Sequence, residues 1–262
     1  MDKKGMYNAL RATLRHQVLN LLGLGAKPAP GIHILNGHRM AQEREPDTVR
    51  QLLTALVQEG VRLVCIEEAV AMIERGERPD VCVVAFTFDD GFMECYDVFA
   101  PLLQEFGVNA LFFVNPNYVA GNDAYVNWFN QHCVDTPGKR PMRWHHLRQL
   151  ASQGFVIGAH TMDHRLMAAQ SEDACRYQVV QCKDVIEQAL GRACHDFAFH
   201  YGKLTDVDEP TIALACATYK HVFSQSDHRH YHSFQGRVIN RRHFEPFWPV
   251  SHVNYFLSVH KK

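Results

Sequence analysis

The sequence has no long apolar run, no strong charge of either sign and no closely spaced cysteine pair. No segment of its 262 residues approaches the ~20 apolar residues that a membrane-spanning helix needs. The net charge of −1 argues against nucleic acid as the main partner, because binding to phosphates needs a concentrated basic face. The eight cysteines include no Cys-x-x-Cys pair, which favours reduced core thiols in a reducing compartment over a disulfide framework or a zinc knuckle.

What the chain does contain is typical of a folded globular protein. Hydrophobic residues make up 47% of the sequence and charged residues 21%, and the length allows one large domain with a substantial core. The 17 histidines supply many candidate metal ligands and proton carriers. We expect a single domain over residues 31–262, preceded by an N-terminal helical segment, residues 1–30.

The N-terminal segment predicts an amphipathic helix with basic residues beside an apolar stripe. The stripe consists of Met6, Leu10, Leu14, Val18 and Leu21. Such a helix either packs on the domain or attaches at an anionic membrane surface. A secretory signal peptide is disfavoured, because the apolar run is short, is broken by a polar residue and lacks a clear small-residue cleavage site.

Apolar runs alternate with helical patterns along the rest of the chain, which predicts parallel βαβ units around one core. Strands are expected over 32–35, 61–66, 81–86, 108–114, 155–159, 196–199 and 219–224. Helices are expected over 48–59, 67–75, 95–106, 144–153 and 173–190. The polar and aromatic segment 115–143 is predicted to be a lid or loop rather than scaffold. Between 226 and 249 only a strand near 237–242 is predicted.

Two adjacent carboxylates, Asp89 and Asp90, follow the apolar run 81–86 within Thr87-Phe88-Asp89-Asp90-Gly91. The carboxyl end of a buried strand is where α/β folds place their chemistry. Neighbouring acids suggest a division of labour, with one bound to metal and one free to move protons. The alternative is a solvated loop pair or a helix N-cap.

Two histidines, His160 and His164, follow the second run, 155–159. One carboxylate and two imidazoles form an incomplete metal shell with room left for water, which suits hydrolysis. A chain this rich in histidine also produces such spacings by chance. The common position at the ends of predicted parallel strands favours the metal site.

Three segments together resemble the motifs of the polysaccharide deacetylases with a NodB-homology domain, carbohydrate esterase family 4. Residues 87–91 resemble the first motif, 160–164 the second and 197–202 the third. Similar segments also occur at 34–39, 110–114 and 144–147, so that the resemblance covers about residues 31–260. It implies an α/β fold, a distorted (β/α) barrel of mostly parallel strands.

The resemblance also implies roles for individual residues. Asp90, His160 and His164 would hold a divalent metal, Zn²⁺ in the first place, with Co²⁺, Ni²⁺ or Fe²⁺ as alternatives. Asp89 would be the general base, and the backbone N–H of Tyr201 would stabilise the oxyanion. A metal with open positions lowers the pKa of bound water and polarises an amide carbonyl.

The sequence departs from the family pattern at the arginine that pairs with the base. The third motif has Ala198 where many members have this arginine. Arg241 resembles an alternative arginine that orients the aspartate in one branch, while Arg237 and Arg242 are rivals for that role.

The general acid is not assigned by the sequence. Leu257-x-x-His260 fits the family's late histidine pattern but lies three residues from the C-terminus. His200, His230 and His232 are further candidates.

These observations predict a metal-dependent N-deacetylase that acts on an N-acylated amino sugar. The expected substrate is a lipid-linked, nucleotide-linked or oligosaccharide precursor of a surface polysaccharide such as O-antigen or capsule. The expected location is the cytoplasm or the inner face of the membrane. The alternatives are a deformylase or other amidase on the same scaffold, and a catalytically impaired sugar-binding protein.

Overall fold

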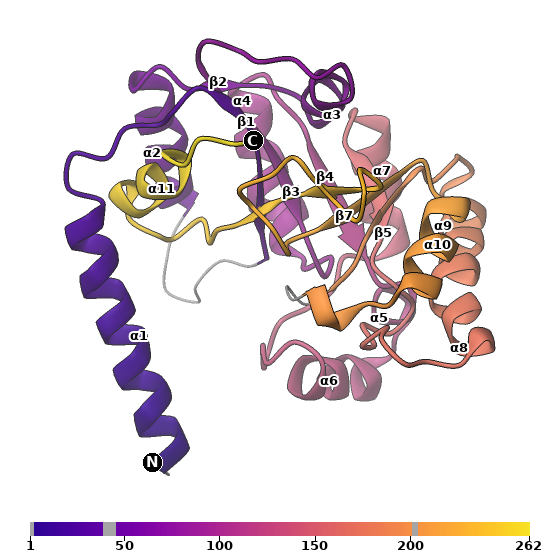
Figure 1. Ribbon diagram of the computed structural model, residues 1–262. Helices are drawn as coiled ribbons and strands as arrows, with labels where there is room; N and C mark the ends of the chain where they lie inside the picture. Colours follow the sequence, from indigo (N-terminus) through magenta and orange to yellow (C-terminus); the bar gives the residue numbers. More distant parts are fainter. Residues whose placement is uncertain (1–2, 39–45, 201–203) are drawn as a thin grey trace.

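A ring of short, mostly parallel strands forms the centre of the protein in a computed structural model, which describes residues 3–38, 46–200 and 204–262 (Figure 1). The strands are β1 (Gly31–Gly37), β2 (Arg62–Leu63), β3 (Cys82–Phe88), β4 (Ala110–Val114), β5 (Val156–Ala159), β6 (Asp196–Ala198), β7 (His221–Ser224), β8 (His232–Ser233), β9 (Val238–Asn240) and β10 (Arg242–His243).

The strand order is β10-β1-β3-β4-β5-β6-β7-β9-β8, with β2 beside β3. Strands β9 and β10 are separated by Arg241 alone, yet β9 pairs with β7 whereas β10 pairs with β1. The segment 238–243 therefore closes the sheet into a barrel. Every pairing in this ring is parallel, and only β8 runs antiparallel to its neighbour. The predicted distorted (β/α) barrel is confirmed.

Helices surround this barrel and fill its connections (Figure 1). They are α1 (Lys3–Leu22), α2 (Pro46–Gln58), α3 (Ile66–Glu74), α4 (Ala100–Glu105), α5 (Pro116–Ala120), α6 (Asp123–His132), α7 (Trp144–Ser152), α8 (Glu172–Arg176), α9 (Cys182–Leu190), α10 (Glu209–Thr218) and α11 (Val250–Leu257). The π-helical turns η1 (Cys95–Phe99) and η2 (Tyr177–Gln181) continue into α4 and α9, and a 3₁₀ turn, η3, covers Leu204–Asp206. The helices predicted over 95–106 and 173–190 thus contain a π-helical turn each.

Residues alternate between the two faces of the strands, because successive side chains of a strand point in opposite directions. On the inner face, Ile34, Ala85 and Phe113 pack in one cluster with Ile66 and Val70 of α3. Their neighbours along the strands belong to a larger cluster with the outer helices, and include Leu35, Val84, Phe86 and Phe112. The inner face continues beyond the apolar residues into the site described below.

The segment 115–143 is not the lid or loop that was predicted. It contains α5 and α6, whose Tyr118, Val126 and Phe129 form a small buried cluster with Phe92. The rings of Tyr118 and Phe129 stack with their centroids 4.2 Å apart. The prediction was wrong because short helices bury the few apolar residues of this segment, and even its polar Asn130 is buried.

Helix α1 projects from the barrel and contacts it at its C-terminal end (Figure 1). There Leu19 is buried, and His252 of α11 lies 2.7 Å from the side-chain oxygen of Asn20. From the predicted apolar stripe, Leu14 and Leu21 are 60% and 69% exposed, and Val18 is also exposed. The side chains of Met6 and Leu10 lie outside the described part. Among the described residues no helix combines the length and apolar character needed to cross a bilayer.

Candidate active site

The site lies at the carboxyl ends of the barrel strands and continues the inner face of the sheet. Two residues after Ala85 comes Thr87, and two further comes Asp89. In the same way His160 lies four residues after Val156, and Arg241 lies two residues after Ile239. Because side chains two apart share a face of a strand, polar residues from distant parts of the chain converge above the apolar core.

The three predicted metal ligands come together in this place. The Oδ1 atom of Asp90 lies 3.4 Å from Nε2 of His164 and 3.7 Å from Nε2 of His160. One ligand atom from each residue lies within 4.8 Å of the other two, and all three side chains are buried. Metal binding itself remains a prediction.

The protonation of the two histidines fits a cation. Nδ1 of His160 lies 2.8 Å from the carbonyl oxygen of Ala198. A carbonyl only accepts, so Nδ1 carries the proton and the lone pair on Nε2 faces Asp90. Burial lowers the pKa of His160 to about 4, and burial together with the neighbouring His160 lowers the pKa of His164 to about 3. Both rings are therefore neutral donors at neutral pH.

The separations of the ligand atoms also fit. Bonds of about 2.0–2.2 Å to a tetrahedral Zn²⁺ place neighbouring ligand atoms roughly 3.4 Å apart. The 3.4 and 3.7 Å separations on Asp90 are close to this value. The chain thus supplies two imidazoles and one carboxylate, a donor set that leaves coordination positions open for water and substrate.

Three residues of the site have left-handed backbone conformations. The φ angle is 71° at Asp90, 63° at Thr161 and 57° at His164. Such conformations are unfavourable for residues other than glycine and persist where the surroundings enforce them. Here the side-chain amide of Asn115 donates to the carbonyl oxygens of His160 and Thr161, and the His164 N–H donates to the Thr161 hydroxyl. The strained loop is held in one conformation.

Asp163 anchors the same loop from the other side. Its carboxylate accepts hydrogen bonds from Asn117 at 2.6 Å, Tyr125 at 2.7 Å and Gln178 at 3.1 Å. Tyr125 belongs to α6, so the segment that was predicted as a lid supports the loop that carries His164. In the structure this segment therefore helps to position His164, a candidate metal ligand.

The Asp89 carboxylate is held by a buried network. Arg241 donates to both of its oxygens, at 2.7 and 3.0 Å, and Asn36 donates to Oδ2 at 2.9 Å. The hydroxyl of Thr87 donates to the Asn36 amide oxygen at 2.8 Å and so fixes the orientation of that amide. Burial alone would raise the pKa of Asp89, but the Arg241 guanidinium, followed by His160 and His38, holds it well below its usual range. Asp89 is therefore anionic.

The structure separates the three candidate arginines. The guanidinium of Arg237 pairs with Glu209 at an exposed position, and that of Arg242 lies over the ring of Phe256, 4.1 Å from its centroid. Only Arg241 of these three forms an ion pair with Asp89, and its side chain is fully buried.

The other predicted residues are more scattered. Tyr201 lies outside the described residues. His230 and His260 are exposed, and His232 starts β8 with a partly exposed side chain. His200 is buried in the site, with its ring centroid 4.5 Å from that of His164.

A second histidine lies as near to Asp89 as His160 does, and sequence reasoning missed it as a site residue. Nε2 of His38 lies 3.8 Å from Oδ2 of Asp89, and Nδ1 lies 3.6 Å from Oε1 of Glu245. Burial would lower the pKa of His38, but the Glu245 interaction and the charges of Asp89 and Asp90 raise it to about 9. The missed signal was spacing, since His38 follows Ile34 and Asn36 by steps of two and therefore lies on the inner face.

The chain belongs to the polysaccharide deacetylase family. The family model described as Polysaccharide deacetylase matches residues 76–216, which is more than half of the 262 residues. Membership makes the chain a hydrolase that acts on the amide bonds of acetylated sugars, as the motifs predicted.

Solved structures of similar fold include several deacetylases. The Streptococcus pyogenes deacetylase PplD in complex with acetate has a TM-score of 0.66 at 20% identity, over 88% of this chain and 99% of that chain. IcaB from Ammonifex degensii gives 0.64 at 20% identity over 89% and 99%. A de-N-acetylase from Aggregatibacter actinomycetemcomitans gives 0.64 at 15% identity over 86% and 98%. No curated protein matches significantly. At these identities the structures show the shared fold.

Proposed function

We propose that the protein is a metal-dependent N-deacetylase that removes the acetyl group from an amino sugar. The observation that supports this most directly is the position of His160 between two carboxylates. Its Nε2 atom lies 3.7 Å from Asp90, the candidate ligand, and 3.8 Å from Asp89, which Arg241 holds in place. The candidate ligand Asp90 and the oriented proton acceptor Asp89 thus lie on either side of the same imidazole nitrogen.

Asp90, His160 and His164 would hold the cation, with Zn²⁺ as the first candidate and Co²⁺, Ni²⁺ or Fe²⁺ as alternatives. When bound, such an ion acts as a Lewis acid toward the amide carbonyl and the attacking water. The buried imidazoles of His160 and His164 are neutral and need to lose no proton to receive it.

Asp89 serves as the general base in this proposal. It accepts a proton from the water as the water oxygen bonds to the acyl carbon. The ion pair with Arg241 keeps the carboxylate charged and fixes the direction of its lone pairs. The same pair weakens it as a base, which greater acidity of the water beside a bound cation would offset.

His38 is the group best placed to protonate the leaving amine. Its pKa is raised to about 9, which favours the protonated form, and its Nε2 atom lies 3.8 Å from Oδ2 of Asp89. As the C–N bond breaks, Nε2 of His38 gives its proton to the amine nitrogen, and acetate and a free amino sugar result. Glu245 is a positioning residue, because its carboxylate faces Nδ1 of His38 and stabilises the imidazolium.

The proposed substrate is the amino sugar of a surface-polysaccharide precursor such as O-antigen or capsule, handled in the cytoplasm or at the inner membrane face. The exposed leucines of α1 lie on a helix that also carries Lys3, Lys4, Arg11 and Arg15 in its sequence. An apolar and basic helix of this kind suits an anionic membrane surface. The eight unpaired cysteines support a reducing compartment.

Release of acetate from N-acetylglucosamine oligosaccharides by the full-length protein tests the proposed chemistry. We expect activity to disappear after chelation and dialysis and to return with one equivalent of Zn²⁺ or Co²⁺. Asp90→Asn should not recover, whereas the control Asp227→Asn, which alters an exposed carboxylate paired with His230, should recover fully. Full activity in metal-free protein would refute the proposal, and faster release of formate from N-formyl analogues would redirect it to a deformylase.

A further inference from the structure

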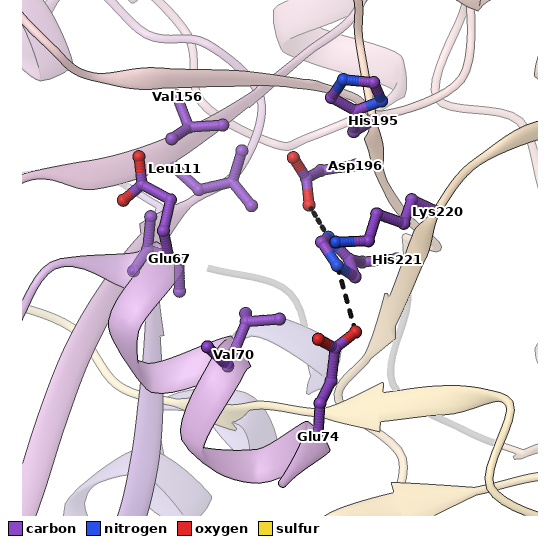
Figure 2. A pocket seen from close by; sticks show the side chains of 11 residues that line it. Glu67, Val70, Glu74, Leu111, Val156, His195, Asp196, Lys220 and His221 are labelled. Atoms are coloured by element: carbon purple, nitrogen blue, oxygen red, sulfur yellow. Dashed lines mark hydrogen bonds and ion pairs between the residues drawn. The ribbon is translucent and has the colours of Figure 1, made fainter.

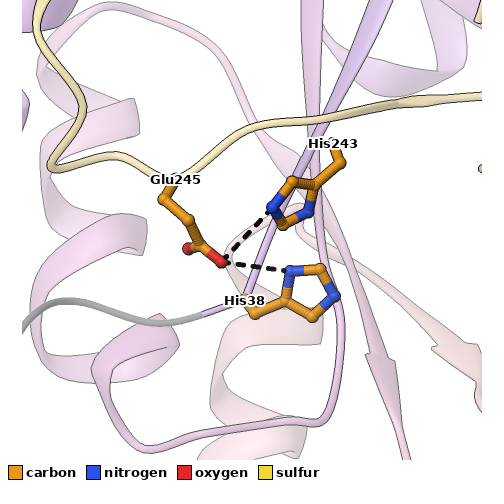
Figure 3. A group of neighbouring side chains, drawn as sticks. All are labelled: His38, His243 and Glu245. Carbon is orange, nitrogen blue, oxygen red and sulfur yellow. Dashed lines mark ion pairs between the residues drawn. The ribbon is translucent and has the colours of Figure 1, made fainter. Parts of the chain in front are cut away.

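A second group of metal-binding side chains lies beside the site, formed by His38, His243 and Glu245 (Figure 3). Strands β1 and β10 are neighbours, with Asn36 paired to His243, and His38 follows two residues after Asn36. Glu245 follows two residues after His243, while Phe244 between them is buried in the outer cluster. The alternation directs the three polar side chains to one face and the phenylalanine to the other.

The geometry of this second group is that of a small cation site. Oε1 of Glu245 lies 3.6 Å from Nδ1 of His38 and 3.8 Å from Nε2 of His243. Figure 3 shows both imidazoles turned toward the same carboxylate oxygen. Two imidazoles and one glutamate are a common donor set for zinc, and the separations approach those set by bonds of about 2.0–2.2 Å.

Access distinguishes this group from the first one. The His243 side chain is 38% exposed and that of His38 is 24% exposed, whereas those of Asp90 and His160 are almost fully buried. The second group is open to solvent at His243, whereas Nδ1 of His38 is buried and the Glu245 side chain is 13% exposed. Within the described residues these two groups are the ones that gather three such ligand atoms.

We propose that His38, His243 and Glu245 form a second, inhibitory site for a transition-metal cation such as Zn²⁺. The inference rests on the proposed function, because it concerns the same proton donor. On binding, Nδ1 of His38 forms a bond to the cation and its proton leaves to solvent. The ring then keeps a single proton on Nε2, and loss of that proton would produce an imidazolate, so the ring no longer serves as an acid at neutral pH.

The cation and the proton that makes His38 an acid compete for the same ring, each through a different nitrogen. Nε2 faces Asp89 and the reacting centre, whereas Nδ1 faces Glu245. The cation therefore occupies the side of the ring away from the substrate and does not need to displace it. Inhibition should lower kcat with little change in KM.

Binding stoichiometry tests the second site independently of catalysis. Equilibrium dialysis of the full-length protein against Zn²⁺ should give two equivalents for wild type. His243→Gln should bind one equivalent because it loses the second site, and Asp90→Asn should bind one because it loses the first. The control His230→Gln, which alters another histidine–carboxylate pair, should still bind two. Glu245→Gln provides a second variant of the new site, and circular dichroism checks that each variant is folded.

Activity tests the inhibitory role, with each protein compared with its own rate at one equivalent of Zn²⁺. Excess Zn²⁺ should lower kcat of wild type by about 10²-fold, the lower end of what general acid–base catalysis contributes. His243→Gln should retain most of its own rate under the same excess.

Three results would overturn the inference. The first is binding of a single equivalent of Zn²⁺ by an active wild type, and the second is binding of two equivalents by His243→Gln. The third is equal inhibition of wild type and His243→Gln by excess Zn²⁺. If wild type and variants show the expected stoichiometries but no protein releases acetate, the second site is supported while its inhibitory role and the proposed function fail together.

Discussion

The two ends of the barrel each place a histidine between two carboxylates, with different surroundings. At the carboxyl ends of the strands, His160 lies between Asp89 and Asp90. At the amino ends, Nδ1 of His221 lies 2.7 Å from Asp196 and Nε2 lies 3.3 Å from Glu74 of α3 (Figure 2). The second histidine stands beside a cavity of about 340 Å³ whose lining includes apolar residues of α3.

What differs is how the polar atoms converge. The carboxyl end gathers ligand atoms from several strands, buries them, and uses left-handed backbone at Asp90 and His164. At the amino end the Glu74 side chain is 46% exposed. The two groups of three possible metal ligands found among the described residues both lie at the carboxyl end. A cavity with a polar rim is therefore a weaker indication of chemistry than convergent, buried donors held by a strained loop.

The largest expected effect on activity comes from replacing an aspartate by asparagine, compared between the two ends of the barrel. Asp89→Asn should lower kcat/KM for N-acetylated oligosaccharide by about 10²–10⁴-fold, because it removes the proton acceptor while preserving shape. Asp196→Asn, at the amino end, should leave kcat/KM nearly unchanged. Steady-state kinetics with stoichiometric Zn²⁺ make the comparison.

The control for this exchange is the metal content of each protein. Both variants should bind as much Zn²⁺ as wild type, because neither changes Asp90, His160 or His164. A large loss of activity in Asp196→Asn with normal metal content would show that the amino end takes part in the reaction.

The next largest effect concerns stability and separates Arg241 from Arg237. Arg241→Met should lower the free energy of unfolding by about 3–5 kcal/mol, because it leaves the Asp89 charge buried without its partner. Arg237→Met removes an exposed ion pair and should leave the unfolding midpoint near that of wild type. Urea unfolding of metal-free protein measures both. Recovery of part of the loss in Arg241→Met/Asp89→Leu would identify the stranded charge as the cause, and equal midpoints for the two single variants would contradict the argument.

The alternating patterns of the sequence predicted parallel βαβ units and the strand ends that carry the central residues, because these depend on short-range patterns, while the barrel was implied by the resemblance to the deacetylase family. The apolar runs before Asp89 and His160 are strands of the ring, and a strand end fixes the place of the residues that follow it. Parity along the strands would also have placed His38 and His200 on the inner face. That step needs the exact strand register, which apolar content alone does not give.

The rest depends on contacts between distant segments. Helix α10 was not predicted, because its small and apolar residues show no single apolar side. The one strand predicted near 237–242 is divided at Arg241 into β9 and β10, and this division follows from their different partners, β7 and β1. The three arginines at 237, 241 and 242 could not be ranked either, because their partners lie far away in the sequence, at Glu209, Asp89 and Phe256.

The smallest expected effect is a shift of the pH profile, again compared between the two ends. His38 must be protonated to donate, so kcat/KM is present below its pKa and lost as pH rises through it. That pKa is raised to about 9, and a cation held by Asp90 lowers it by repulsion, so the basic limb should fall between 6.5 and 9. Glu245→Gln removes the carboxylate beside Nδ1 and should move the limb to lower pH, whereas His221→Gln at the amino end should not move it. An unmoved limb in Glu245→Gln would mean that another group supplies the proton, because the interaction of Glu245 with His38 is the one that this variant removes.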